Sequence, residues 1–214
     1  MGEDNQSMKP EDFTCQWFME DKPTITYEQK SLEVVIDFFK SYKAKSNLVM
    51  MDIGAHIGYW SIQMSPYFDT IHAFECNPDL FPTLTLNTYK FNNITLHPYG
   101  IDTKLEQKDF NYFPENEFIG SYMLSKEYFE NENKFSKNLI VTVAPPKIQG
   151  PVHFIKIDVE GAELNVLEAC YKYKQYDPLL HIEIHPEQDR TLYTKEYVTI
   201  LHSIDESNHI AKYK

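Results

Sequence analysis

Short apolar segments alternate with amphipathic ones, and this pattern constrains the fold more than any other feature of the chain. Five runs of strand length are almost continuously apolar, and the stretches between them repeat apolar residues at helical spacing. The expected strands are LVMMDIG (48–54), TIHAFEC (70–76), ITLHPYGI (94–101), VHFIKIDVEG (152–161) and LLHIEIHP (179–186). This pattern is typical of an α/β fold with a mostly parallel sheet and helices on both faces.

The segments between the strands predict helices over 31–42, 59–68, 77–93, 162–173 and 191–204. The first would bury Leu32, Val35, Ile36 and Phe39, and Asn77 would cap the third. The last would place five apolar residues on one face: Tyr193, Tyr197, Ile200, Leu201 and Ile204.

The domain organisation follows from where this periodicity is present. Residues 1–24 are polar and broken by proline, so we expect an N-terminal arm, and 25–214 would form a single domain. Within it, residues 103–150 lack clear periodicity. We interpret them as an irregular insertion near the site of the acceptor substrate.

Charge and cysteine content narrow the classes of partner. The formal net charge of −12 disfavours a nucleic-acid partner, because such proteins usually present a basic face. Three scattered cysteines, an acidic N-terminus and no apolar run of membrane-spanning length predict a cytoplasmic protein without a membrane span.

The stretch MDIGAHIGYW places a glycine-containing turn directly after the first expected strand. Gly54 and Gly58 would let the backbone turn sharply into a helix, with Ala55 and His56 between them. An acidic residue two before the first glycine, here Asp52, is typical of the D-x-G-x-G-x-G pattern of S-adenosylmethionine sites, with His56 at the middle glycine. The dehydrogenase pattern G-x-G-x-x-G fits this stretch less well. A strand-to-helix turn without a ligand is the alternative.

Polar residues end the other expected strands. Glu75 stands where an acidic residue binds a ribose diol, or it is a solvated strand-end carboxylate. Asp102 would lie beside an adenine amino group or in an exposed turn. Asp158 and Glu160, like Glu183 and His185, alternate so that each pair shares a face. Glu160 has helix capping at Gly161 as its alternative, and His185 is either a general base or a packed histidine.

Several of these stretches together resemble the FkbM-type S-adenosylmethionine-dependent methyltransferases. DIGAHIGYWS, AFECNP, FIKIDVEGAE, HIEIHP and FIGSYML are similar to the family's characteristic segments over roughly residues 25–205. The resemblance implies a Rossmann-like class I methyltransferase fold and S-adenosyl-L-methionine as cofactor. It further implies methyl transfer, which we expect to reach a hydroxyl oxygen of a small molecule or glycan.

The positions at the strand ends and the resemblance together give the candidate site residues. The catalytic candidates are Asp158, Glu183 and His185, and no metal ligand is assigned. The cofactor-binding candidates are Asp52, Gly54, Ala55, His56, Gly58, Glu75, Cys76, Asp102 and Asp158.

Three departures from the family pattern accompany the resemblance. His56 replaces the usual Asn, and Cys76 stands where Pro is common. The class I sheet normally ends in an antiparallel hairpin, of which only HIAKYK remains here, so we expect a shortened sheet. An open edge would need a cover, and a homo-oligomer would supply one.

Two other functional classes fit the same residues. One is a catalytically silent cofactor-binding module on the same fold. The other is a divalent-metal-dependent O-methyltransferase in which Asp158, Glu160 and Glu183 supply oxygen ligands.

Overall fold

The computed structural model describes residues 23–41, 47–113, 116–121, 137–186 and 188–214. Most of the expected N-terminal arm therefore lies outside the described residues. No helix in the described ranges combines the length and apolar character needed to cross a membrane.

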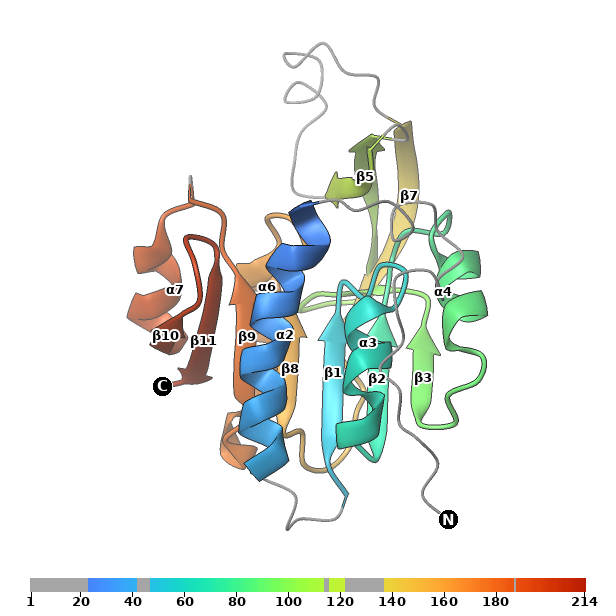
Figure 1. The fold of residues 1–214 in the computed structure, drawn as a ribbon. Coiled ribbons are helices and arrows are strands. Elements are labelled where there is room, and N and C mark those ends of the chain that lie inside the picture. Colours follow the sequence, from blue (N-terminus) through green and yellow to red (C-terminus); the bar gives the residue numbers. More distant parts are fainter. Residues whose placement is uncertain (1–22, 42–46, 114–115, 122–136, 187) are drawn as a thin grey trace, which may run out of the picture.

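A seven-stranded sheet forms the centre of the molecule, in the order β10-β11-β9-β8-β1-β2-β3. The five strands from β9 to β3 pair in parallel, whereas β11 is antiparallel to both β9 and β10. Figure 1 shows the sheet with helices in front and behind. The strands are β1 (Val49–Ile53), β2 (Thr70–Phe74), β3 (Ile94–His97), β8 (Phe154–Ile157), β9 (Leu179–Glu183), β10 (Val198–Ser203) and β11 (Asn208–Tyr213).

Each face of this sheet packs against its own helices. On one face Met50, Phe154 and Leu179 contact α2 (Pro23–Ser41) and α3 (Tyr59–Met64) in a single apolar cluster. On the other, α6 (Glu163–Cys170) and α7 (Arg190–Glu196) pack through a second cluster. The α/β fold with helices on both faces is therefore confirmed.

The helices depart from expectation mainly at their ends. In α2, Leu32, Val35 and Phe39 are buried as expected, and Ile36 is partly buried. Helix α3 continues into a 3₁₀ turn, η2 (Ser65–Tyr67), and α6 into η3 (Tyr171–Tyr176). Helix α4 (Phe81–Thr88) begins later than expected, because Asn77 closes a preceding turn by accepting from the Asp79 N–H at 3.0 Å.

The expected helix over 191–204 was wrong. Helix α7 ends at Glu196, and the chain continues as strand β10. Val198, Thr199 and Ile200 are β-branched and favour a strand, and β10 pairs with β11 to complete the hairpin. The expectation of a shortened sheet was therefore wrong as well.

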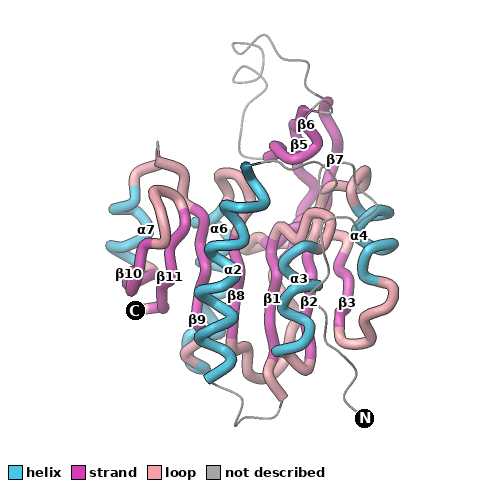
Figure 2. The backbone as a smooth tube through the Cα atoms, in the orientation of Figure 1, coloured by secondary structure: helices cyan, strands magenta, loops and turns pink. Residues whose placement is uncertain are grey.

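The segment 103–150 is not irregular throughout. It contains β5 (Glu106–Phe113), β6 (Asn116–Ser121) and β7 (Lys137–Ala144), which join β4 (Gly100–Ile101) in a second sheet. Val141 and Val143 point inward, but the outward Ile140 is 58% exposed and hides the period-two pattern. In Figures 1 and 2 this sheet stands beyond the carboxyl ends of the central strands.

A glycine-to-alanine pair tests how tightly the ends of β1 and β8 meet. A Cβ on Gly54, where φ is +77°, would lie 1.8 Å from the carbonyl oxygen of Asp158. We expect Gly54→Ala to lower the free energy of unfolding by more than about 3 kcal/mol. Gly150→Ala is the control, since φ is +87° there and no atom lies within 4 Å. It should cost only about 1–2 kcal/mol for the left-handed backbone. Equal losses in urea unfolding would contradict the expected contact.

Candidate active site

The turn between β1 and α3 takes left-handed backbone conformations at three positions. The φ angle is +77° at Gly54, +54° at His56 and +96° at Gly58. Asn and His enter this region more readily than most other residues. His56 can therefore adopt the left-handed conformation that the turn has at this position.

Neighbouring elements hold this turn in place. The N–H groups of Gly54 and Ala55 both donate to the carbonyl oxygen of Phe74, at 3.0 and 2.9 Å. Asn87 of α4 donates to the carbonyl oxygen of Ile57 at 2.9 Å. The turn is thus tied to β2 and to α4.

Glu75 follows β2 and links the glycine turn to the next loop. Its Oε2 accepts from the His56 N–H at 2.8 Å, and its Oε1 accepts from the Asn77 N–H at 2.7 Å. Burial raises the pKa of Glu75 to about 7, against the effect of the two amide hydrogen bonds. Each oxygen retains a second lone-pair site, so the carboxylate can still accept from ligand hydroxyls.

Asp52 lies beneath the turn and is 0% exposed. Its Oδ2 accepts from Ser61 Oγ at 2.6 Å, which ties β1 to α3. Its Oδ1 is 3.7 Å from the Nζ of Lys156. Burial raises the pKa of Asp52, whereas Lys156 and Ser61 act in the opposite direction. The contacts of this predicted cofactor residue are therefore with the core.

Lys156 of β8 lies below the glycine turn, next to Asp52, and is 3% exposed. Its Nζ donates to the carbonyl oxygen of Gly54 at 2.7 Å and lies 3.2 Å from Asp158 Oδ2. Burial opposes its charge, yet the nearby carboxylates raise the pKa of Lys156 well above its ordinary value. Sequence reasoning missed this residue. Its signal was a lysine inside an apolar strand, because buried lysines are nearly always paired.

Helix α2 contributes a carboxylate that sequence reasoning also missed. Glu28 lies in the first half of α2, and the amino end of this helix lies at the carboxyl edge of the sheet (Figure 1). It interacts electrostatically with Lys156, Asp158 and Asp52. Although the residue is only half-buried by exposed area, burial raises the pKa of Glu28 to about 7, and Lys156 opposes that rise.

Asp158 and Glu183 stand side by side at the ends of β8 and β9 and hydrogen-bond to each other. Burial, together with the charges of Asp158 and Glu160, raises the pKa of Glu183 to about 9. Burial acts in the same direction on Asp158, but Lys156 outweighs it and lowers the pKa of Asp158. The pair therefore holds its proton on Glu183 at neutral pH.

The loops after β8 and β9 make a second contact through Glu160 and His185. Glu160 Oε2 is 2.9 Å from His185 Nε2. Glu160 has a φ of +53°, and burial raises its pKa while the hydrogen bond to His185 lowers it. The expected alternative of a Glu160 cap does not apply, because the Gly161 N–H donates to Glu163 Oε1 at 2.8 Å.

Glu163 and Gln188 connect the loops after β8 and β9 through further hydrogen bonds. Glu163 Oε2 accepts from Gln188 Nε2 at 3.0 Å and from the Tyr193 hydroxyl at 3.3 Å. Gln188 Oε1 in turn accepts from the His185 N–H at 2.7 Å. This bracing positions His185 relative to β8.

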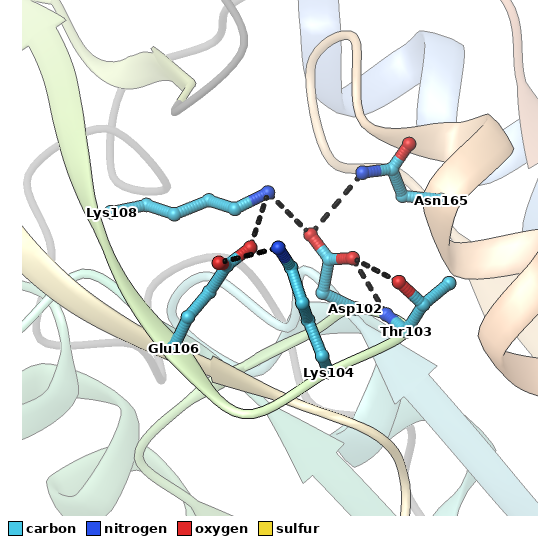
Figure 3. Close-up of polar contacts among 6 residues, drawn as sticks. All are labelled: Asp102, Thr103, Lys104, Glu106, Lys108 and Asn165. Atoms are coloured by element: carbon cyan, nitrogen blue, oxygen red, sulfur yellow. Dashed lines mark hydrogen bonds and ion pairs between the residues drawn. The ribbon is translucent and has the colours of Figure 1, made fainter.

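Asp102 connects the second sheet to α6 (Figure 3). Its Oδ1 accepts from the N–H and hydroxyl of Thr103, at 2.6 and 3.2 Å. Its Oδ2 accepts from Lys108 Nζ at 2.7 Å and from Asn165 Nδ2 at 3.2 Å. Burial by itself would raise the pKa of Asp102, but these contacts outweigh it and lower that pKa. Both oxygens are committed to the protein, and a role at an adenine stays a prediction.

Cys76 faces the second sheet. It packs against an apolar cluster built by Phe110, Val141 and Val143. Burial raises the pKa of its thiol well above the ordinary value, followed by the effect of Glu75. The side chain is therefore a packing group in this structure, and its predicted part in cofactor binding is untested.

Glu183→Gln tests the assignment of the shared proton through the pH dependence of stability. A carboxyl whose pKa rises from 4.5 to about 9 on folding stabilises the fold most below 4.5. That contribution is lost as the pH rises toward 9, because the folded chain must then release the proton. Glutamine mimics the neutral carboxyl at every pH. We therefore expect the free energy of unfolding of Glu183→Gln, relative to that of the wild type, to increase as the pH rises from about 5 to about 8.

Urea unfolding at several pH values measures this difference, with Glu168→Gln on the outer side of α6 as control. A constant difference between Glu183→Gln and the wild type would contradict a proton on Glu183.

Comparison with known proteins identifies the family of the chain and proteins of similar structure. The model of the Methyltransferase FkbM domain matches residues 52–206, well over half of the chain. Methyltransferase FkbM from Methylobacillus flagellatus KT is similar in structure, with a TM-score of 0.51 and 18% identity over 78% of this chain. This chain spans only 44% of that one.

The yhhF protein from Escherichia coli is also similar, with a TM-score of 0.53 and 9% identity, covering 91% of this chain and 89% of that one. At these identities the two structures show a shared fold. No match is found among curated proteins. On the evidence of the family model, the chain belongs to the FkbM methyltransferase domain family.

Proposed function

We propose that this protein transfers a methyl group from S-adenosyl-L-methionine to a hydroxyl oxygen of a small molecule or glycan. The observation that carries the proposal is the braced glycine turn at the end of β1, with Glu75 hydrogen-bonded to it at 2.8 Å. In a parallel sheet, ligands bind outside the carboxyl ends of the strands, and this turn lies at the central one.

The donor set of the site fits this cofactor. The carboxyl groups of Glu28, Asp52 and Asp158 lie around one buried ammonium, that of Lys156, and Glu183 lies beside Asp158. A ligand that brings a sulfonium and an ammonium would offset this excess of acidic groups. Among the predicted residues, Glu75 would hold the ribose hydroxyls, the Gly54–Gly58 turn the methionine part, and Asp102 would lie near the adenine.

When bound, the cofactor supplies a methyl group already activated on sulfur. The chain's own residues then have to align the acceptor oxygen and accept its proton. Three residues are candidates for the base. Asp158 is a weak base because Lys156 lowers its pKa, and Glu183 already carries a proton. His185, paired with Glu160 at 2.9 Å, is the base that these environments favour.

Cofactor binding tests the first part of the proposal. We expect calorimetry to show S-adenosylmethionine and its demethylated product binding at micromolar strength, and NADH far more weakly. Glu75→Ala should reduce that affinity at least about tenfold, because hydrogen bonds to a charged group are lost. Glu75→Gln, which keeps one acceptor oxygen, should lose less. Glu168→Gln serves as the control for removing a remote carboxylate, and tighter binding of NADH would contradict the proposal.

Methyl transfer tests the second part. The wild type, incubated with the cofactor and a panel of sugars, phenols and alcohols, should yield an O-methylated product detectable by mass spectrometry. We expect His185→Gln to slow this reaction by roughly 10²–10⁴-fold with little change in cofactor affinity. Asp158→Asn should act mainly on the KM of the acceptor.

The same experiment separates the two other classes. Tight cofactor binding without product across the panel would indicate a silent binding module. Activity that a chelator removes and Mg²⁺ restores would indicate a metal-dependent enzyme.

A further inference from the structure

Three polar residues stand next to one another across the centre of the sheet. Asp52 of β1 pairs in register with Lys156 of β8, which pairs in register with His181 of β9. All three point toward α2 and α3, because Phe154 and Leu179, two residues earlier on their strands, belong to the apolar cluster on that face. The apolar interior therefore ends at a row of buried polar groups directly below the candidate site.

Lys156 carries the positive charge in this row. His181 is 2% exposed, and its ring is tilted against that of Trp60 at a centroid distance of 4.8 Å. Neither of its ring nitrogens has a hydrogen-bond partner among the described residues. Burial, followed by the charge of Lys156, lowers the pKa of His181 to about 3. The imidazole is therefore neutral, and it contributes no positive charge to balance the carboxylates.

The Lys156 ammonium joins the ends of two strands. It donates to the Gly54 carbonyl oxygen at 2.7 Å, in the glycine turn, and contacts Asp158 at 3.2 Å, in the loop after β8. These backbones also touch, since a Cβ on Gly54 would lie 1.8 Å from the Asp158 carbonyl oxygen. A displacement of either strand end would therefore move the other.

We propose that Lys156 is a positioning residue, whose ammonium holds the Gly54 carbonyl and the Asp158 carboxylate in the arrangement that cofactor binding requires. The inference rests on the proposed function, because the turn is taken as the cofactor site. Lys156 itself lies below the turn and acts through Gly54 and Asp158.

A consequence for protonation follows. With Lys156 beside it, Asp158 stays ionised while Glu183 keeps the shared proton. Without the ammonium, burial would act on Asp158 with only the hydrogen bond from Glu183 as the main opposing effect, so the pKa of Asp158 would rise. The geometry of the Asp158–Glu183 pair would then vary with pH. If Lys156 acted through packing alone, its replacement would introduce no such pH dependence.

Four proteins test the proposal: the wild type, Lys156→Met, the double variant Lys156→Met/Asp158→Asn, and Lys30→Met. Lys30 is a matched control, since its Nζ also donates to a backbone carbonyl, that of Ile204 at 3.0 Å, but on the outer side of α2. The probe is S-adenosylhomocysteine, which lacks the sulfonium charge. Its dissociation constant is measured by calorimetry at about pH 5.5 and pH 8, and thermal melting confirms that each protein is folded.

We expect Lys156→Met to weaken binding at least about tenfold at pH 8 and clearly less at pH 5.5, because protonation relieves the unpaired carboxylate. The double variant should melt higher than the single one and lose most of this pH dependence, and Lys30→Met should bind like the wild type. If Lys156→Met does not fold, Lys156→Gln, which keeps a donor without the charge, provides the same comparison.

Each other outcome is decisive. Wild-type affinity in the lysine variant at both pH values would overturn the proposal. So would an equal, pH-independent weakening in the single and double variants, which indicates a packing role alone. Failure of the wild type to bind the probe would instead contradict the proposed function.

Discussion

The contact of the Lys156 ammonium with the Gly54 carbonyl oxygen and the Asp158 carboxylate is the interaction on which the rest of the site depends. A lysine that is 3% exposed has lost nearly all its hydration, so its charge is tolerable only with such oxygen partners. Removing one partner of a buried ion pair typically costs 3–5 kcal/mol, because the other charge is then uncompensated. The ammonium therefore requires the ends of β1 and β8 to stay together.

The strand order explains why the other site residues gather around this contact. Strand β1 lies between β2 and β8, and β9 follows β8. The parallel direction brings the residues after these strands to one edge, which places Glu75, Asp158 and Glu183 beside the glycine turn. Glu75 braces the turn from the β2 side and Lys156 from the β8 side. The site is thus built on strand ends rather than on long loops.

Much of this architecture could be predicted from local patterns. Four of the central parallel strands were expected within a few residues, because buried strands are continuous apolar runs with recognisable ends. The expected strand over 94–101 divides into β3 of the central sheet and β4 of the second sheet. The helix over 191–204 was wrong because the apolar spacing in VTIL also fits a helix face, and pairing with β11 adds to the strand preference of its β-branched residues. The strands of the second sheet were missed for a similar reason, since Ile140 is apolar yet exposed.

By itself, the sequence determined the strand-to-helix alternation, the glycine turn and the acidic residues at strand ends, because these depend on neighbouring residues and their spacing. Only the tertiary structure decided their chemistry. Asp52 and Asp102 are hydrogen-bonded to protein groups. Glu183 carries the proton of the pair that it forms with Asp158. Lys156 and Glu28 also belong to the site. Proton affinity and hydrogen bonding depend on burial and on charges brought together from distant parts of the chain, and no local pattern encodes those distances.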